Sequence, residues 1–102
     1  MAVAATLASG IALAAPANAA QGGNDNSGPP KNYHAWIKIG HDEMRQLAGQ
    51  ARATCVHVVH DWSACDNMQG GLQAEFNWNP NANGYWAEYY PNDGGRMRHG
   101  TW

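Results

Sequence analysis

Charge is scarce in this 102-residue sequence, and neither sign dominates it. Asp, Glu, Lys and Arg make up only 14% of the residues, with six basic side chains against eight acidic ones. A nucleic-acid-binding domain normally carries a clustered excess of Lys and Arg, and a peripheral membrane protein carries a polybasic patch. The sequence therefore gives no strong nucleic-acid signal and no patch that would hold the chain on a membrane.

Nucleophiles and ligand motifs are equally rare. Ser63 is the only serine after Tyr33, and the sequence contains no nucleophile elbow, no Gly-rich phosphate loop and no zinc-type spacing of Cys and His. These absences speak against serine hydrolases, nucleotide-binding proteins and zinc fingers. We expect no cofactor.

The N-terminus predicts an export signal. Residues 1–20 contain no charged side chain and are mostly Ala, Leu, Val and Ile, and they end in Pro16 followed by Ala17–Ala19 (Ala-Asn-Ala). A small-x-small pattern after an apolar stretch is typical of a signal peptidase site. The stretch is too short and too rich in Ala to cross roughly 30 Å of hydrocarbon. We predict a signal peptide over residues 1–20, cleaved after Ala19 or Ala20.

One feature of this leader departs from the usual pattern, because no Lys or Arg precedes Lys31. In its Ala-rich composition the leader resembles those of secreted proteins from high-GC bacteria. This resemblance implies a bacterial protein that is secreted to the medium, the periplasm or the cell wall. After removal of the leader we expect no membrane association.

The mature chain predicts one small domain, residues 33–102, preceded by a flexible linker, residues 21–32. Gly, Asn and Pro dominate the linker, and no apolar residue recurs in it at a regular interval. A domain of about 70 residues has a marginal hydrophobic core, so a covalent cross-link matters. Cys55 and Cys65 are the only cysteines, and we predict a disulfide between them because exported proteins meet an oxidising compartment.

Two elements are predicted in the first half of the domain. Tyr33–Ile39 alternates, with His34, Trp36 and Lys38 on one side and smaller or aliphatic residues such as Ala35 and Ile37 on the other, which indicates a half-buried strand. Apolar residues then recur at helical spacing from Met44 to Ala51, which predicts an amphipathic helix. Cys55–Trp62 fits a continuation of that helix or a strand, and its three valines favour the strand.

The last third predicts a three-stranded antiparallel meander. Leu72–Trp78, Tyr85–Tyr90 and Arg96–Trp102 are alternating runs rich in aromatic residues, and the turn sequences NPNANG and PNDGG separate them. Pairing Trp78 with Tyr85 and Tyr90 with Arg96 gives the meander an apolar face and a polar face. A slip of one residue in a strand would exchange its two faces. The predicted polar face consists of Gln73, Glu75, Asn77, Trp86, Glu88, Tyr90, Arg96 and Arg98.

The expected fold class is therefore α+β. We predict one amphipathic helix packed on a small antiparallel sheet, made of the C-terminal meander and one or two N-terminal strands, with a single disulfide.

The leading functional hypothesis is a secreted binding protein, either an inhibitor or antagonist or a ligand-binding module. The chain has five tryptophans and four tyrosines, more aromatic rings than so small a core can bury. Trp86 and Tyr90 on the polar face predict an aromatic platform for a sugar ring or a protein partner, with Arg96 and Arg98 beside them. Alternatively, the two rings pack against the first strand or the disulfide loop. The expected partner is an extracellular protein or a carbohydrate.

A small hydrolase is the alternative. Glu75, Glu88 and Arg98 would form a row across the polar face, which with His99 could supply a general base and a cation for an anionic transition state. A helix followed by a sheet bearing Glu, Arg and a late His resembles the small secreted microbial ribonucleases, although His99 here lies next to the C-terminus. This resemblance implies a nuclease. A solvated face of ion pairs, or a structural protein of the cell wall, would explain the same residues.

One further cluster suggests metal ligands only if it is helical. His57, His60 and Asp61 would share one side of a helix, whereas on a strand His60 would point away from the other two. Because a strand is the favoured interpretation of this segment, we predict no metal site.

Overall fold

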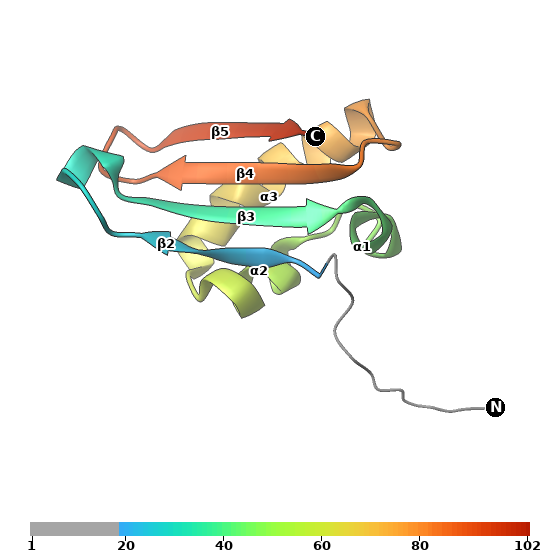
Figure 1. The fold of residues 1–102 in the computed structure, drawn as a ribbon, viewed down its shortest axis with the longest axis horizontal. Helices are drawn as coiled ribbons and strands as arrows, with labels where there is room; N and C mark the ends of the chain where they lie inside the picture. Colours follow the sequence, from blue (N-terminus) through green and yellow to red (C-terminus); the bar gives the residue numbers. More distant parts are fainter. Residues whose placement is uncertain (1–18) are drawn as a thin grey trace.

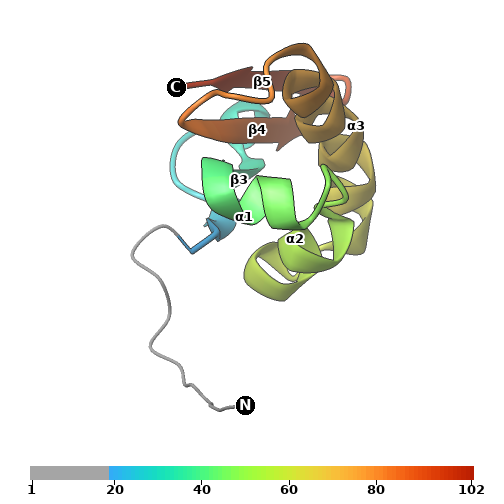
Figure 2. The same ribbon diagram turned by 90° about the vertical axis from the view of Figure 1, so that its right-hand side faces the viewer.

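The computed structural model describes residues 19–102, so almost all of the predicted signal peptide lies outside the described residues. Four strands form one antiparallel sheet in the order β2-β3-β4-β5. α3 packs against β4 and β5, and α2 packs against β2 and β3. Figures 1 and 2 show these two helices on the same side of the sheet, with α1 at the end of β3. The elements are β2 (Gln21–Asp25), the 3-10 helix η1 (Pro30–Asn32), β3 (His34–Gly40), α1 (His41–Gln46), α2 (Arg52–Val59), α3 (Trp62–Trp78), β4 (Gly84–Tyr90) and β5 (Arg96–Thr101).

The predicted α+β class and the predicted disulfide are both confirmed. Cys55 in α2 and Cys65 in α3 are joined, with their Cα atoms 5.7 Å apart. The chain turns between the two helices at His60, which adopts a left-handed conformation (φ 61°). Asp61 then caps α3 by accepting a hydrogen bond from the Ala64 backbone N–H at 3.0 Å. The disulfide thus fixes the corner between α2 and α3.

Two segments predicted as strands are helical. The favoured strand at Cys55–Trp62 is wrong, because most of this segment lies in α2, where Cys55 and Val59 face the core one helical turn apart. The predicted first strand of the meander, Leu72–Trp78, is the last part of α3. Met68 and Leu72 are both fully buried in this helix, and their four-residue spacing is that of one helix face.

The predicted helix over Met44–Ala51 is only partly formed, because residues 47–51 lie between α1 and α2. α1 ends at Gln46, and Ala48 (φ 53°) and Gly49 (φ 80°) reverse the chain before α2 begins. Left-handed conformations cannot continue a right-handed helix, so the apolar pattern across Met44–Ala51 spans a bend.

The segment predicted as a flexible linker contains the edge strand β2, which is a correction to that prediction. Its register pairs Gly22 with Ile37 and Gly23 with Trp36. A Cβ atom at Gly22 would lie 2.8 Å from a methyl group of Val59, so glycine here permits close packing of α2. The strand ends at Asp25, where hydrogen bonds from the Ser27 side chain and backbone lower the pKa of the carboxyl.

The core lies between the helices and the inner face of the sheet. Tyr85 is its largest fully buried side chain, and its hydroxyl donates to the Asn79 carbonyl at 2.5 Å. Burial raises the pKa of Tyr85 above the ordinary value of 10.0. Above that pH the unfolded chain loses a proton that the folded chain retains, so stability falls as the pH rises further. The other buried residues include Ala35, Ile37, Ile39, Met44, Cys55, Val59, Cys65, Met68, Leu72 and Ala87.

Candidate functional site

The outer face of the sheet is covered by none of the described helices and carries the candidate site (Figure 2). Strand alternation sends one set of residues of β3 and β4 inward, including Ile37, Tyr85 and Ala87, and the other set outward. The register then places Lys38 beside Trp86, Trp36 beside Glu88, and Glu88 beside Arg98. We call this surface the platform face: His34, Trp36, Lys38, Trp86, Glu88, Tyr90, Arg96, Arg98 and Trp102.

Three tryptophans on the platform face each cover a glycine of the neighbouring strand. Trp36 pairs with Gly23 and Trp86 with Gly100, while Trp102 bonds through its backbone N–H to the Gly84 carbonyl. A Cβ atom at Gly100 would lie 2.9 to 3.0 Å from three atoms of the Trp86 ring. Such nearly equal distances mean that the indole lies flat over the glycine backbone. Glycine at these positions therefore lets the rings lie along the sheet.

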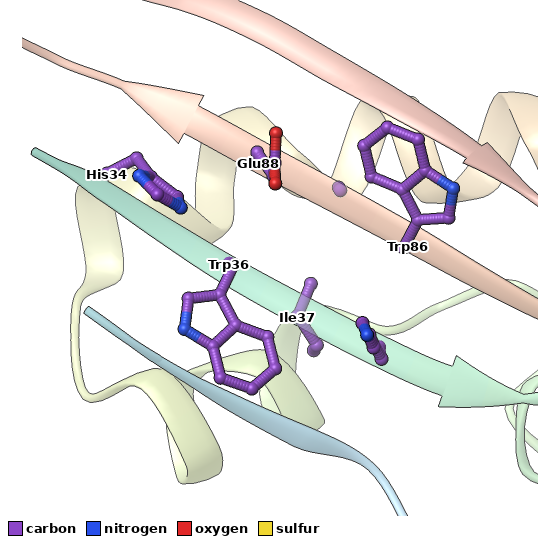
Figure 3. A pocket seen from close by; sticks show the side chains of 7 residues that line it. His34, Trp36, Ile37, Trp86 and Glu88 are labelled. Carbon is purple, nitrogen blue, oxygen red and sulfur yellow. The ribbon is translucent and has the colours of Figure 1, made fainter. Parts of the chain in front are cut away.

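Figure 3 shows Trp36 and Trp86 face on, with their rings turned toward opposite edges of the sheet. Between them lies a shallow groove of about 250 Å³, which His34, Lys38 and Glu88 also line. Clefts that hold drug-sized molecules measure roughly 300–1,000 Å³. The groove is therefore of a size for a single ring or a short polar chain.

A second hollow shares Lys38, Trp86 and Glu88 with the first. It measures about 510 Å³ and is lined by Lys38, Glu88, Arg98 and Trp102 as well as Trp86. Trp102 is 52% exposed, so its ring is accessible from solvent. Trp86 therefore borders both hollows, and each has aromatic and charged residues in its lining.

Glu88 is the carboxylate at the centre of the platform face. It accepts a hydrogen bond from the Tyr90 hydroxyl at 3.0 Å, and the Arg98 guanidinium lies 3.6 Å away. Its side chain is only one quarter exposed. Two neighbours thus hold the carboxylate in place while leaving it open to the groove, where it can accept hydrogen bonds from a ligand.

Tyr90 is placed on this face as predicted, but the residue is only 8% exposed. The His34 ring stacks on it at 4.6 Å between centroids, and the Arg96 guanidinium lies 4.2 Å from its centroid. Arg96 also forms an ion pair with Asp93 at 2.9 Å. Tyr90 and Arg96 therefore support the platform, and Trp86 is the predicted binding aromatic whose ring remains accessible.

The predicted catalytic residues are divided between the two faces of the sheet. Glu88 and Arg98 meet on the platform face, whereas Glu75 lies on α3 and pairs with His99 on the inner side at 2.6 Å. The predicted row of Glu75, Glu88 and Arg98 is wrong, because Glu75 belongs to a helix and not to a strand. The pair Glu88–Arg98 and the pair Glu75–His99 therefore cannot act on one substrate group, because they lie on opposite faces of the sheet.

The residues His57, His60 and Asp61 also do not form a metal-binding group. His57 and His60 are exposed, and Asp61 is engaged in capping α3. Within residues 19–102, no group of three His, Cys, Asp or Glu side chains could hold a metal ion. No helix in this part of the chain is long and apolar enough to cross a membrane.

Half of the platform was missed by the sequence prediction. Alternation in Tyr33–Ile39 had placed His34, Trp36 and Lys38 on one side of a strand, but nothing in the sequence says that this strand lies beside β4. The sequence feature that could have revealed the platform is the presence of glycines that pair with tryptophans across neighbouring strands, Gly23 with Trp36 and Gly100 with Trp86. Compared with protein-family models, curated proteins and solved structures, this chain has no match.

Proposed function

We propose that this chain is an extracellular carbohydrate-binding module whose platform face holds sugar rings against Trp86 and Trp36. The supporting observation is that both indoles lie flat along the sheet and border one shallow groove. The C–H face of a sugar ring is apolar and packs on an aromatic ring, while its hydroxyl groups require polar partners at the rim. The platform offers both kinds of contact.

The polar residues of the groove match hydroxyl groups. Glu88 is a fixed acceptor, Lys38 lies beside Trp86 on β3, and the Arg98 guanidinium lies over the Trp86 ring, 5.9 Å from its centroid, so both cations can donate to a ligand at this ring. His34 uses Nδ1 in a 2.8 Å contact with the Asn32 carbonyl, which leaves Nε2 for a ligand. A few fixed polar groups around an apolar surface are the usual composition of a small-ligand site.

Charge distribution favours a sugar over a protein partner. The centres of protein–protein interfaces are depleted of charged side chains, whereas Lys38, Glu88 and Arg98 lie at the centre of the platform face. Nucleic acid is disfavoured because Arg96 and Arg98 already have acidic partners and because the whole chain has a net charge of −2.

Export is part of the proposal. The disulfide between Cys55 and Cys65 supports it, since disulfides persist in oxidising compartments. The predicted leader supports it from the sequence. In this proposal the ligand is a polysaccharide or glycan outside the cytoplasm.

Affinity electrophoresis of the oxidised protein through gels containing neutral and acidic polysaccharides tests the function, followed by calorimetric titration with oligosaccharides of any that retards it. We expect Trp86→Ala to weaken binding at least tenfold, which corresponds to about 1.4 kcal/mol. Trp78→Ala is the matched control, because Trp78 lies on α3 away from the platform and is 89% exposed.

Two results would contradict the proposal. In the first, no polysaccharide retards the wild-type protein, and the wild type but not Trp86→Ala captures a protein from culture medium. The other is an equal loss of sugar binding in Trp86→Ala and Trp78→Ala, which would move the site off the platform.

A further inference from the structure

The start of the described chain is held by a carboxylate. The backbone N–H of Ala20, directly before β2, donates to Oε1 of Glu43 at 2.7 Å. Glu43 lies in α1 and is partly buried. Ala19 and Ala20 lie in a groove of about 450 Å³, which is also lined by Glu43 and by His57 of α2. The contact therefore ties the beginning of the edge strand to the helical side of the fold.

We infer that the chain is processed between Ala19 and Ala20, and that Glu43 binds the new α-ammonium group of Ala20. A peptidase that recognises small residues at the first and third positions before the cut would find Ala17 and Ala19 there. Hydrolysis breaks the peptide bond with one water molecule. Ala19 gains the hydroxyl of a carboxyl group, and Ala20 gains a hydrogen on its amine. The amine takes a further proton from solvent at neutral pH.

The geometry distinguishes between the two cleavage positions that the sequence allows. After a cut at Ala19, the nitrogen already placed 2.7 Å from Glu43 becomes positively charged. A hydrogen bond from a neutral amide N–H to the carboxylate then becomes an ion pair with an ammonium group, which adds an attraction between opposite charges. After a cut at Ala20, that nitrogen is lost, and the new terminus is Gln21, which pairs with Lys38 in the sheet. The cut after Ala19 is thus the one that stabilises the product.

Cleavage after Ala19 would thereby increase the stability of β2. The strand lies at the edge of the sheet, with β3 as its single partner strand. An ion pair at Ala20, directly before the strand, would hold this edge strand against α1. This inference is independent of the ligand bound at the platform face.

The first experiment is export of the full chain from a bacterial host, followed by intact mass and N-terminal sequencing of the product. We expect a protein that begins at Ala20. A product that begins at Gln21, or near Met1, would overturn the inference.

The second experiment measures the role of the charge. Glu43→Gln retains an oxygen that accepts from a neutral N–H but removes the charge that balances an ammonium group. The substitution is made in the oxidised full chain and in a chain that begins at Ala20, which contains every described helix and strand. We expect it to lower the melting temperature of the Ala20 chain by on the order of 4 °C and to lower that of the full chain by less.

Equal decreases in the two chains would show that Glu43 has only a structural role and would overturn the capture of the ammonium group. Glu75→Gln serves as the matched control in both chains, because Glu75 pairs with His99 and does not contact Ala20. Its effect must be the same whether or not the leader is present.

Discussion

The two faces of the sheet differ in how far their side chains are buried. On the inner face, Ile37 and Tyr85 are fully buried under helices. On the outer face, Trp36 and Trp86 occupy the alternating positions of the same strands and remain partly exposed. In the proposed function, stability and recognition therefore depend on alternate residues of β3 and β4. Substitutions on one face should therefore affect one property far more than the other.

The largest effect on stability is expected from the inner side. Leu72 of α3 is fully buried, and Leu72→Ala removes its packing and leaves a cavity, which should lower the free energy of unfolding by about 2–5 kcal/mol. Urea denaturation monitored by circular dichroism measures this change. Ligand affinity of the folded protein should stay within twofold, and a tenfold loss would show that the two faces are coupled.

The disulfide should rank next. The chain-entropy relation for a loop of the size closed by Cys55 and Cys65 gives about 2.7 kcal/mol, and the two cysteines lie 10 residues apart. We expect the double substitution of both by Ala to lower the unfolding free energy by that amount. Reduction of the wild-type protein should reproduce the shift in urea midpoint, and a reduced protein as stable as the oxidised one would contradict the prediction.

The smallest stability effect, with a large effect on binding, is expected at Gly100. Gly100→Ala places a Cβ atom 2.9 Å from the Trp86 ring, so the indole must tilt away from the sheet. We expect a change below about 1 kcal/mol in unfolding free energy, a changed near-UV circular dichroism spectrum and several-fold weaker binding of any sugar that the wild type binds.

Gly70 provides the matched control for that substitution. It lies on α3, and no atom lies within 4 Å of a Cβ atom added there. Gly70→Ala should therefore stabilise the helix by about 0.5–1 kcal/mol with no change in binding. An unchanged Trp86 signal in Gly100→Ala would refute the role assigned to the glycine.

The sequence predicted the hairpin of β4 and β5 well because its signals are local. The turn sequence and the alternation of apolar and polar residues together determine that Tyr90 pairs with Arg96. The run Leu72–Trp78 was wrongly predicted as a strand because its apolar residues fit both the two-residue repeat of a strand and the four-residue spacing of a helix face. Its helical form depends on packing against β4 and β5, which no local pattern reports.

The platform face was half predictable for the same reason. Trp86 and Arg98 could be placed together from the hairpin, but the contribution of β3 depends on which strand lies beside β4. β2 was invisible because Gly22 and Gly23 have no side chains to form a pattern. Their absence of side chains is what admits Val59 on one face and Trp36 on the other.

The position of β5 at the end of the sheet bears on how the protein behaves when it is concentrated. An edge strand exposes backbone groups that can pair with another copy of the same chain. In β5, Arg96 and Arg98 project from one face, and a second β5 docked antiparallel to the first in the register that pairs Arg98 with Arg98 would bring like charges together. Like charges placed opposite each other destabilise a strand pair, so these two arginines disfavour that register of self-assembly along this edge.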